Sequence, residues 1–256
     1  MSYVRFNRKI WYNIYWYSPF YEECYRHLGG NNKRRMIPKN YSGFAIDFKY
    51  SSEVESRAIV LACTITDTPY RVVHNAQDVK PDEIPVGNIK FIQNILGYIV
   101  KPDYYPEYLS DYFHRKIWFT NDYPRENVFI KPSDEYKRFD GEVVTGEQKH
   151  SGPFVCSEII NIVDEWRYYI CKGEILYASW YDGIGEPQDA PVLNIKFDKK
   201  LCCCLDFGML DNGKLALIES QHPFSCGWYG KSSSDVCKIY AKWVAYGWDF
   251  MLKLNI

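Results

Sequence analysis

Residues 205–229 read L-D-F-G-M-L-D-N-G-K-L-A-L-I-E-S-Q-H-P-F-S-C-G-W-Y and carry the clearest structural signal in the chain. The Asn-Gly pair at 212–213 separates two apolar runs, a pattern that strongly predicts a β-hairpin. Asp206 lies on the first predicted strand, and Glu219 and Gln221 lie at the end of the second. Because Mg²⁺ takes oxygen ligands and usually shares them with a substrate phosphate, this hairpin predicts phosphate chemistry.

The segments before this hairpin supply the positive charge that such chemistry needs. The apolar run V-F-I-K-P ends in Lys131 and a proline, and Lys137 follows within Y-K-R-F-D-G-E. Residues 165–181 read as a second hairpin, with Arg167 near the start of its first strand. Lysine places a point charge on phosphate oxygens, and arginine offers them a planar fork. These three cations are therefore candidates for a clamp on a nucleotide triphosphate.

The order of these motifs resembles a known family. I-K-P, K-x-F-x-G, S-E, E-W-R, D-F-G and E-S-Q, with G-W-Y downstream, resemble the ATP-grasp superfamily, most closely the clade named for one arginine and two lysines. The likeness runs over residues 118–229, and I-P-V-G at 84–87 and Y-P at 105–106 resemble the preceding domain of that clade. It implies an α+β fold in which two α+β lobes surround an ATP cleft. We expect residues 1–110 to include a small α/β domain and residues 111–256 to form the ATP-grasp domain.

The resemblance also implies a reaction. Such enzymes ligate a carboxylate to an amine through an acyl phosphate and release ADP and phosphate, with magnesium bridging the phosphates of ATP. By matching motif, Lys131 and Lys137 would contact those phosphates. Arg167 would contact the transferred phosphate or the acyl group, so Lys137 and Arg167 are the predicted catalytic residues. The expected partners are therefore ATP, a carboxylate-bearing small molecule or peptide, and an amine acceptor.

The same resemblance assigns the remaining site residues. Asp206 and Glu219 would bind magnesium. The last family ligand is usually Asn, and here its position holds Gln221, which offers an amide oxygen on a longer arm. Glu158 would lie in the hinge near the adenine or ribose. Gly141 belongs to a glycine-containing loop, residues 140–152, that would cover the triphosphate.

Two other functions stay open at this stage. Residues 137–141, K-R-F-D-G, resemble the K-x-D-G motif of lysine-adenylating nucleotidyltransferases, although one residue too many separates the lysine from the aspartate. The chain could also be a non-catalytic nucleotide-binding module that keeps the fold. Each candidate residue, taken alone, also has an ordinary structural explanation as a solvated strand end or turn. The functional interpretation depends on their order and spacing.

Composition restricts the class of protein. Apolar residues make up 46% and charged residues 25% of the 256, as in globular proteins. The net charge of −1 makes nucleic acid an unlikely partner, and no apolar run approaches the ~18 residues of a membrane span. Nine cysteines without a C-x-x-C spacing or a signal peptide predict reduced thiols and a cytoplasmic location. Oligomeric state is not predicted.

The rest of the chain gives a coarse outline. We expect an edge strand at residues 11–16 and a helix at 21–28, within an aromatic-rich segment. Short apolar runs at 44–48, 59–63 and 70–73 predict strands, and a helix is expected near 88–96. A C-terminal helix, capped by Ser233 or Ser234, places Val236, Ile239, Tyr240, Trp243 and Phe250 on one buried face.

Overall fold

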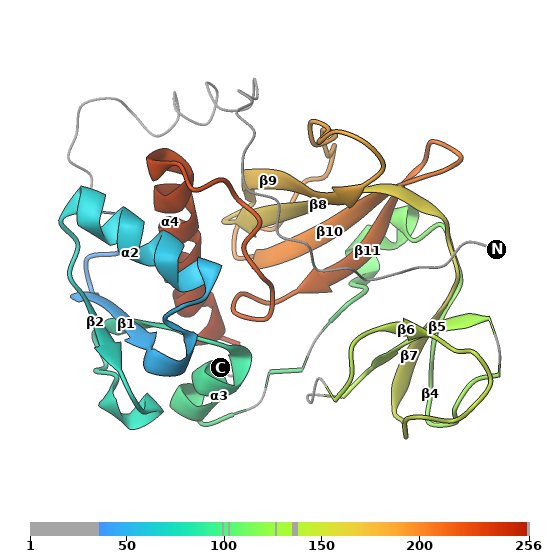
Figure 1. Ribbon diagram of the computed structural model, residues 1–256, viewed down its shortest axis with the longest axis horizontal. Helices are drawn as coiled ribbons and strands as arrows, with labels where there is room; N and C mark the ends of the chain where they lie inside the picture. The colour runs from blue at the N-terminus through green and yellow to red at the C-terminus, as the bar shows by residue number, and fades with distance from the viewer. Residues whose placement is uncertain (1–35, 99, 102, 126, 135–137, 255–256) are drawn as a thin grey trace. The chain divides into compact units, whose positions relative to one another are not determined.

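A computed structural model describes residues 36–254, except residues 99, 102, 126 and 135–137. The expected strand at 11–16 and helix at 21–28 lie outside the described residues. Three sheets and several helices follow one another along the chain, coloured from blue to red in Figure 1.

The first sheet is parallel and has the order β2-β1-β3. Its strands are β1 (Gly43–Asp47), β2 (Tyr70–Val73) and β3 (Glu83–Val86), and its helices are α2 (Val54–Thr66) and α3 (Ile89–Leu96). The short 3₁₀ helices η1 (Phe48–Tyr50) and η2 (Ala76–Asp78) follow β1 and β2. The prediction of strands at 44–48 and 70–73 and of a helix near 88–96 agrees with these bounds.

The expectation of a strand at 59–63 was wrong, because this run lies inside α2. The buried positions of α2 include Glu55, Ala58, Ile59, Ala62 and Cys63. They recur three or four residues apart, so they share one face of a helix. A short apolar run looks the same in a buried helix and in a strand, which explains the error.

The second sheet is antiparallel and has the order β4-β7-β5-β6. The helix η3 (Glu107–Tyr112) precedes it, and its strands are β4 (Ile117–Thr120), β5 (Val128–Pro132), β6 (Glu142–Val143) and β7 (Phe154–Glu158). Its core contains Ile130, Val144, Phe154 and Cys156. Lys131 therefore follows a fully buried residue, and alternation along the strand turns its side chain away from that core.

The third sheet is also antiparallel, with the order β11-β10-β8-β9. Its strands are β8 (Ile162–Cys171), β9 (Glu174–Gly183), β10 (Cys202–Leu210) and β11 (Leu215–Gln221), as two hairpins. The first turns at Lys172 and Gly173, whose φ angles are 54° and 81°, and the second at Gly213, whose φ is 78°. Both predicted hairpins are present, and positive φ angles are typical of such tight turns.

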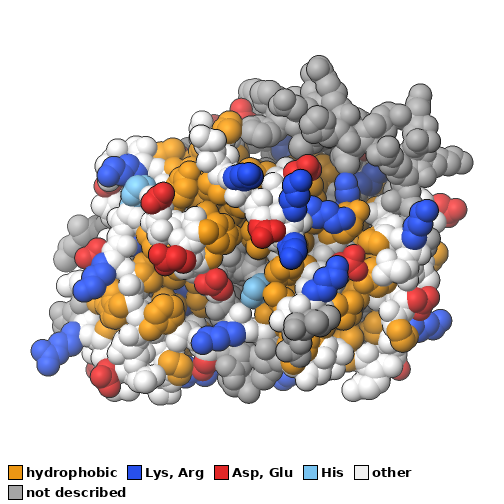
Figure 2. Space-filling view, turned by 180° about the vertical axis from the view of Figure 1, so that it is seen from behind, with side chains coloured by type: hydrophobic (Ala, Val, Ile, Leu, Met, Phe, Trp, Pro, Cys, Tyr) orange, Lys and Arg blue, Asp and Glu red, His pale blue; other side chains and the backbone are white. Residues whose placement is uncertain are grey.

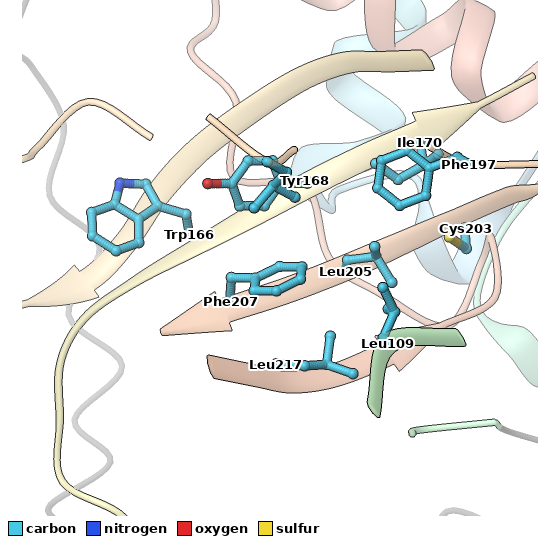
Figure 3. Packing of buried hydrophobic residues seen from close by; sticks show 10 residues of the cluster. Leu109, Trp166, Tyr168, Ile170, Phe197, Cys203, Leu205, Phe207 and Leu217 are labelled. Carbon is cyan, nitrogen blue, oxygen red and sulfur yellow. The ribbon is translucent and has the colours of Figure 1, made fainter. Parts of the chain in front are cut away.

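One face of this sheet forms a hydrophobic core. Figure 3 shows Trp166, Tyr168 and Ile170 of β8 on the same side as Leu205 and Phe207 of β10. Leu109, Leu193 and Phe197 cover this face from outside the sheet. Side chains at the alternate positions, including Arg167 and Asp206, must then point to the opposite face.

The C-terminal helix α4 (Ser234–Met251) packs against α2 and the third sheet, and Figure 1 shows it (red) beside α2 (cyan). Trp243 is 1% exposed, and its indole N–H donates to the carbonyl oxygen of Ile170 at 3.1 Å. The predicted stripe is confirmed at Val236, Tyr240 and Trp243, while Ile239 and Phe250 are half-buried. Ser233 is the N-cap residue, although its side chain makes no capping hydrogen bond.

Two properties of the whole chain follow from these elements. Within the described ranges, none of the helices combines the length and the apolar character that a membrane crossing requires. On the face in Figure 2, basic and acidic side chains are interspersed with hydrophobic ones. This mixture agrees with the balanced net charge.

Candidate functional site

Four polar residues form a row across the third sheet. Ser179 of β9 pairs with Arg167 of β8, Arg167 pairs with Asp206 of β10, and Asp206 pairs with Glu219 of β11. Arg167 and Asp206 alternate with the core residues of Figure 3, so the row lies on the face away from that core. Residues far apart in sequence thus meet on one surface.

A β-bulge makes Glu219 part of this row. Phe207 pairs with Leu217, but the next position, Asp206, pairs with Glu219, so Ile218 is an extra residue on β11. Leu217 is buried in the core. Regular alternation would turn Glu219 to the same side as Leu217, and the extra residue brings it beside Asp206 instead.

Arg167 and Asp206 form a buried ion pair in the middle of the row. The guanidinium donates to Oδ1 at 2.7 Å and to Oδ2 at 2.6 Å, and the two side chains are 6% and 2% exposed. Burial alone would lower the pKa of Arg167, but Asp206 reverses this and the pKa is raised. Burial also raises the pKa of Asp206, and Arg167 opposes that shift. The arginine is therefore a permanent cation.

Lys131 and Glu219 form a second ion pair, which joins the second sheet to the third. Their side chains are 12% and 15% exposed, and the amide nitrogen of Gln221 donates to the same carboxylate. Burial acts to raise the pKa of Glu219, but Lys131 outweighs it and the pKa is lowered. The pKa of Lys131 is raised, since Glu219 outweighs the effect of burial. Both groups are charged at neutral pH.

Aromatic rings and a glycine surround the Lys131 ammonium. It lies 5.2 Å from the ring centre of Tyr104 and 5.5 Å from that of Phe129. A Cβ atom at Gly141 would lie 2.5 Å from the Phe129 ring and 3.0 Å from Cε of Lys131. Gly141 is thus packed directly against Lys131, where a larger residue would displace the lysine.

An open groove lies next to this lysine. It has a volume of about 320 Å³ and is lined by Lys101, Asp103, Tyr104, Phe119 and Ser133. Tyr104 also contacts Lys131, so the groove provides space for a ligand beside the ammonium.

The other two predicted residues are not in this group of contacts. Glu158 is exposed at the end of β7, where its carboxylate accepts a hydrogen bond from the backbone N–H of Lys116 at 2.9 Å. It lies between the second and third sheets, since β8 begins at Ile162. Lys137 lies outside the described residues.

Three residues near Arg167 were not predicted from the sequence. Its guanidinium carbon lies 4.6 Å from the ring centre of Tyr229 and 5.4 Å from that of Tyr181. The hydroxyl of Tyr181 donates to Glu165, and burial raises the pKa of Glu165 to about 7. Glu165 lies two positions before Arg167 in a strand, and this spacing was the available signal that both share one face.

The donor atoms of the row fit magnesium when phosphate oxygens complete its coordination. Asp206 and Glu219 pair directly across two strands, and Gln221 contacts Glu219. Oxygen donors of this kind suit Mg²⁺, which usually takes one or two carboxylates together with substrate phosphates. Among the described residues, no three His, Cys, Asp or Glu side chains form a metal site by themselves. The phosphates are therefore a necessary part of the predicted site.

Two cations and two carboxylates that meet between two antiparallel sheets define an ATP-grasp enzyme. The second family of ATP-grasp domains in the clade named for its arginine and two lysines matches residues 112–239, half of the chain. The chain belongs to this family of ATP-dependent ligases, and the predictions of an α+β ATP-grasp fold and of this clade are confirmed.

Several solved structures are similar to the chain. The ATP-grasp ligase PsnB complexed with a minimal precursor has a TM-score of 0.45 and 9% identity, covering 79% of this chain and 99% of that one. D-alanine–D-alanine ligase from Bacillus anthracis has a TM-score of 0.40 and 12% identity, covering 84% and 98%. N5-carboxyaminoimidazole synthase from Aspergillus clavatus has a TM-score of 0.38 and 10% identity, covering 71% and 70%. No curated protein sequence matches the chain.

Proposed function

We propose that this protein joins a carboxylate to an amine through an acyl phosphate, with release of ADP and phosphate. The observation that supports this most directly is the convergence of Lys131, Glu219, Asp206 and Arg167 between two sheets. Cations that neutralise a triphosphate and oxygens that hold its metal are the two halves of a phosphoryl-transfer site.

The two ion pairs suggest how the site changes when ATP binds. Lys131 now contacts Glu219, and Arg167 contacts both oxygens of Asp206. In the proposed complex, Lys131 would bind a phosphate oxygen in place of Glu219. Asp206, Glu219 and Gln221 would hold magnesium, which would neutralise phosphate charge. Each buried charge would then keep an opposite charge beside it.

The positions of the cations assign their roles. Lys131 would bind the ATP phosphates from the second sheet, together with Lys137. Arg167 would hold the phosphoryl group as it moves to the substrate carboxylate. Phosphoryl transfer needs positioning and charge stabilisation more than covalent help, so losing one such contact should reduce turnover about 10²–10³-fold.

The loop at residues 140–152 would close over the triphosphate. Its first glycine, Gly141, already packs against Lys131. Glu158, at the junction of the two sheets, would contact the adenine or ribose. The substrate carboxylate would lie near Arg167, because the acyl phosphate must form there.

The test uses hydroxylamine, which traps acyl phosphates as hydroxamates. We would incubate the protein with ATP, magnesium and a pool of the twenty amino acids, and measure ADP, AMP and hydroxamate. We expect ADP and hydroxamate in equal amounts, and a loss of about 100-fold or more in Lys131→Met and Glu219→Gln. The matched controls are Lys214→Met and Glu174→Gln, which change exposed residues on hairpins of the third sheet.

Other outcomes would point elsewhere. AMP attached covalently to Lys137 would support the adenylating alternative, whereas a carboxylate ligase leaves Lys137 unmodified. Full ADP formation by Glu219→Gln in the presence of the acid would contradict the assignment of this residue to magnesium.

A further inference from the structure

Glu165 lies beside the proposed reaction centre, and the roles assigned above do not include it. It is two residues before Arg167 on β8, and Figure 3 shows the residue between them, Trp166, directed into the core. Glu165 and Arg167 therefore share the face that carries Asp206 and Glu219. A rise of about 3.3 Å per residue places their Cα atoms about 7 Å apart.

A bulge in the neighbouring strand supplies Glu165 with a partner. Trp166 pairs with Trp180 and Glu165 pairs with Asp182, so Tyr181 is an extra residue on β9. Its hydroxyl donates to the Glu165 carboxylate. One carboxylate oxygen is thereby fixed in direction, which is what a group that transfers a proton needs.

The Tyr181 ring connects Glu165 to Arg167 and to solvent. It stacks on the ring of Tyr229 with a centroid distance of 4.7 Å and an angle of 11°. Both rings lie near the Arg167 guanidinium, and Tyr229 is 46% exposed. A substrate that reaches Arg167 along these rings would also reach Glu165.

The charged groups around Glu165 come from all four strands of the sheet. Burial is the largest effect on its pKa, the hydrogen bond from Tyr181 opposes it, and Asp206, Asp182 and Glu219 add to the rise. Arg167 lies on the same strand but is bound to Asp206. The resulting pKa of about 7 lets the carboxyl group both accept and release a proton near neutral pH.

We propose that Glu165 is the general base for the amine that attacks the acyl phosphate at Arg167. The neutral amine forms a C–N bond to the acyl carbon while the C–O bond to phosphate breaks. Phosphate leaves with that electron pair, and the proton lost by the nitrogen goes to Glu165. Glu165 then releases the proton to solvent. The acceptor is accordingly a primary amine, which Glu165 also attracts in its ammonium form.

The other carboxylates near Arg167 are less suited to this step. Asp206 accepts two hydrogen bonds from Arg167, and Glu219 is paired with Lys131. Both are also the candidates for magnesium. Asp182 is exposed and opposite Glu165, so it is a weaker base than a buried carboxylate.

The inference rests on the proposed function, and its test separates the two. Hydroxylamine is largely neutral at pH 7 and reacts with acyl phosphates without a base, whereas an alkyl amine must lose a proton. We would supply ATP, magnesium and the twenty amino acids with and without hydroxylamine, and measure the ratio of amide to hydroxamate between pH 5.5 and 9. General-base catalysis contributes about 10²–10⁴-fold. We therefore expect the ratio to fall at least about 100-fold in Glu165→Gln and to stay unchanged in the control Glu174→Gln.

The pH profile adds a readout that a purely structural role would not change. In the wild-type protein the ratio should rise with pH around 7, as Glu165 becomes ionised. Tyr181→Phe removes the hydrogen bond that lowers the pKa of Glu165, so this rise should move to higher pH. It should be absent in Glu165→Gln.

The remaining outcomes overturn the inference in different ways. An unchanged ratio in Glu165→Gln, or an equal loss of amide and hydroxamate, would show that Glu165 is not the base. No hydroxamate from the wild-type protein would overturn the proposed function itself, and this inference with it.

Discussion

The Arg167–Asp206 ion pair should dominate the stability of the third sheet against single substitutions. Replacing Arg167 with Met leaves the Asp206 carboxylate 2% exposed and without its two charge-assisted hydrogen bonds of 2.7 and 2.6 Å. Such bonds contribute about 1.5–3 kcal/mol each, and breaking one side of a buried pair costs about 3–5 kcal/mol. We therefore expect Arg167→Met to lower the free energy of unfolding by about 3–5 kcal/mol.

The double variant tests whether the loss comes from the unpaired charge. Arg167→Met/Asp206→Leu replaces the pair with apolar side chains, which is often close to neutral for a buried pair. It should recover most of the loss and lie within about 1–2 kcal/mol of the wild-type protein, while catalysis stays absent. Urea unfolding at 25 °C measures both differences. For a chain of this size the single variant should also unfold about 6–20 °C lower.

A second ion pair of the same shape serves as a control. Arg71 donates to both oxygens of Glu83, with Nε–Oε1 and Nη2–Oε2 distances of 2.7 Å, but the Arg71 side chain is 38% exposed. Because water can reach this pair, Arg71→Met should cost about 1 kcal/mol or less. A loss below about 1 kcal/mol in Arg167→Met, or a double variant less stable than the single one, would refute the reasoning.

Two further predictions concern pH and the hairpin turn. The pKa of Glu165 rises from 4.5 to about 7 on folding, so the wild-type protein should lose up to about 3 kcal/mol relative to Glu165→Gln as pH increases from about 4.5 to 7; parallel stability curves from urea unfolding at pH 5 and 8 would contradict this. Gly213 has a φ of 78° at the tip of the second hairpin, so Gly213→Ala should lower the unfolding free energy by about 1–2 kcal/mol without changing ATP affinity, and an unchanged urea midpoint would argue against a left-handed turn.

Local sequence signals were sufficient for the hairpins and most strands. Asn-Gly and Lys-Gly turns determine where the chain reverses, so the two hairpins of the third sheet follow from the sequence. The run at 59–63 shows the limit, because its burial on α2 depends on packing against α4. Apolar residues alone do not report that helix.

The candidate site was only partly accessible to the same reasoning. Motif order pointed to Lys131, Arg167, Asp206 and Glu219, and the structure brings all four together. Their pairing with one another was not foreseeable, since it depends on which strands are neighbours. The predicted boundary between residues 110 and 111 and the individual roles stay predictions.

The bulges explain why alternation along the strands would have misled a stricter prediction. Leu217 is in the core and Glu219 follows it by two, so an ideal strand would direct Glu219 toward the core. The extra residue at Ile218 reverses this, and Tyr181 has the same role on the outer strand. Bulges commonly redirect side chains at functional sites. Two of them bracket the row that contains Arg167 and Asp206, so the irregular positions of this sheet, rather than its regular ones, assemble the site.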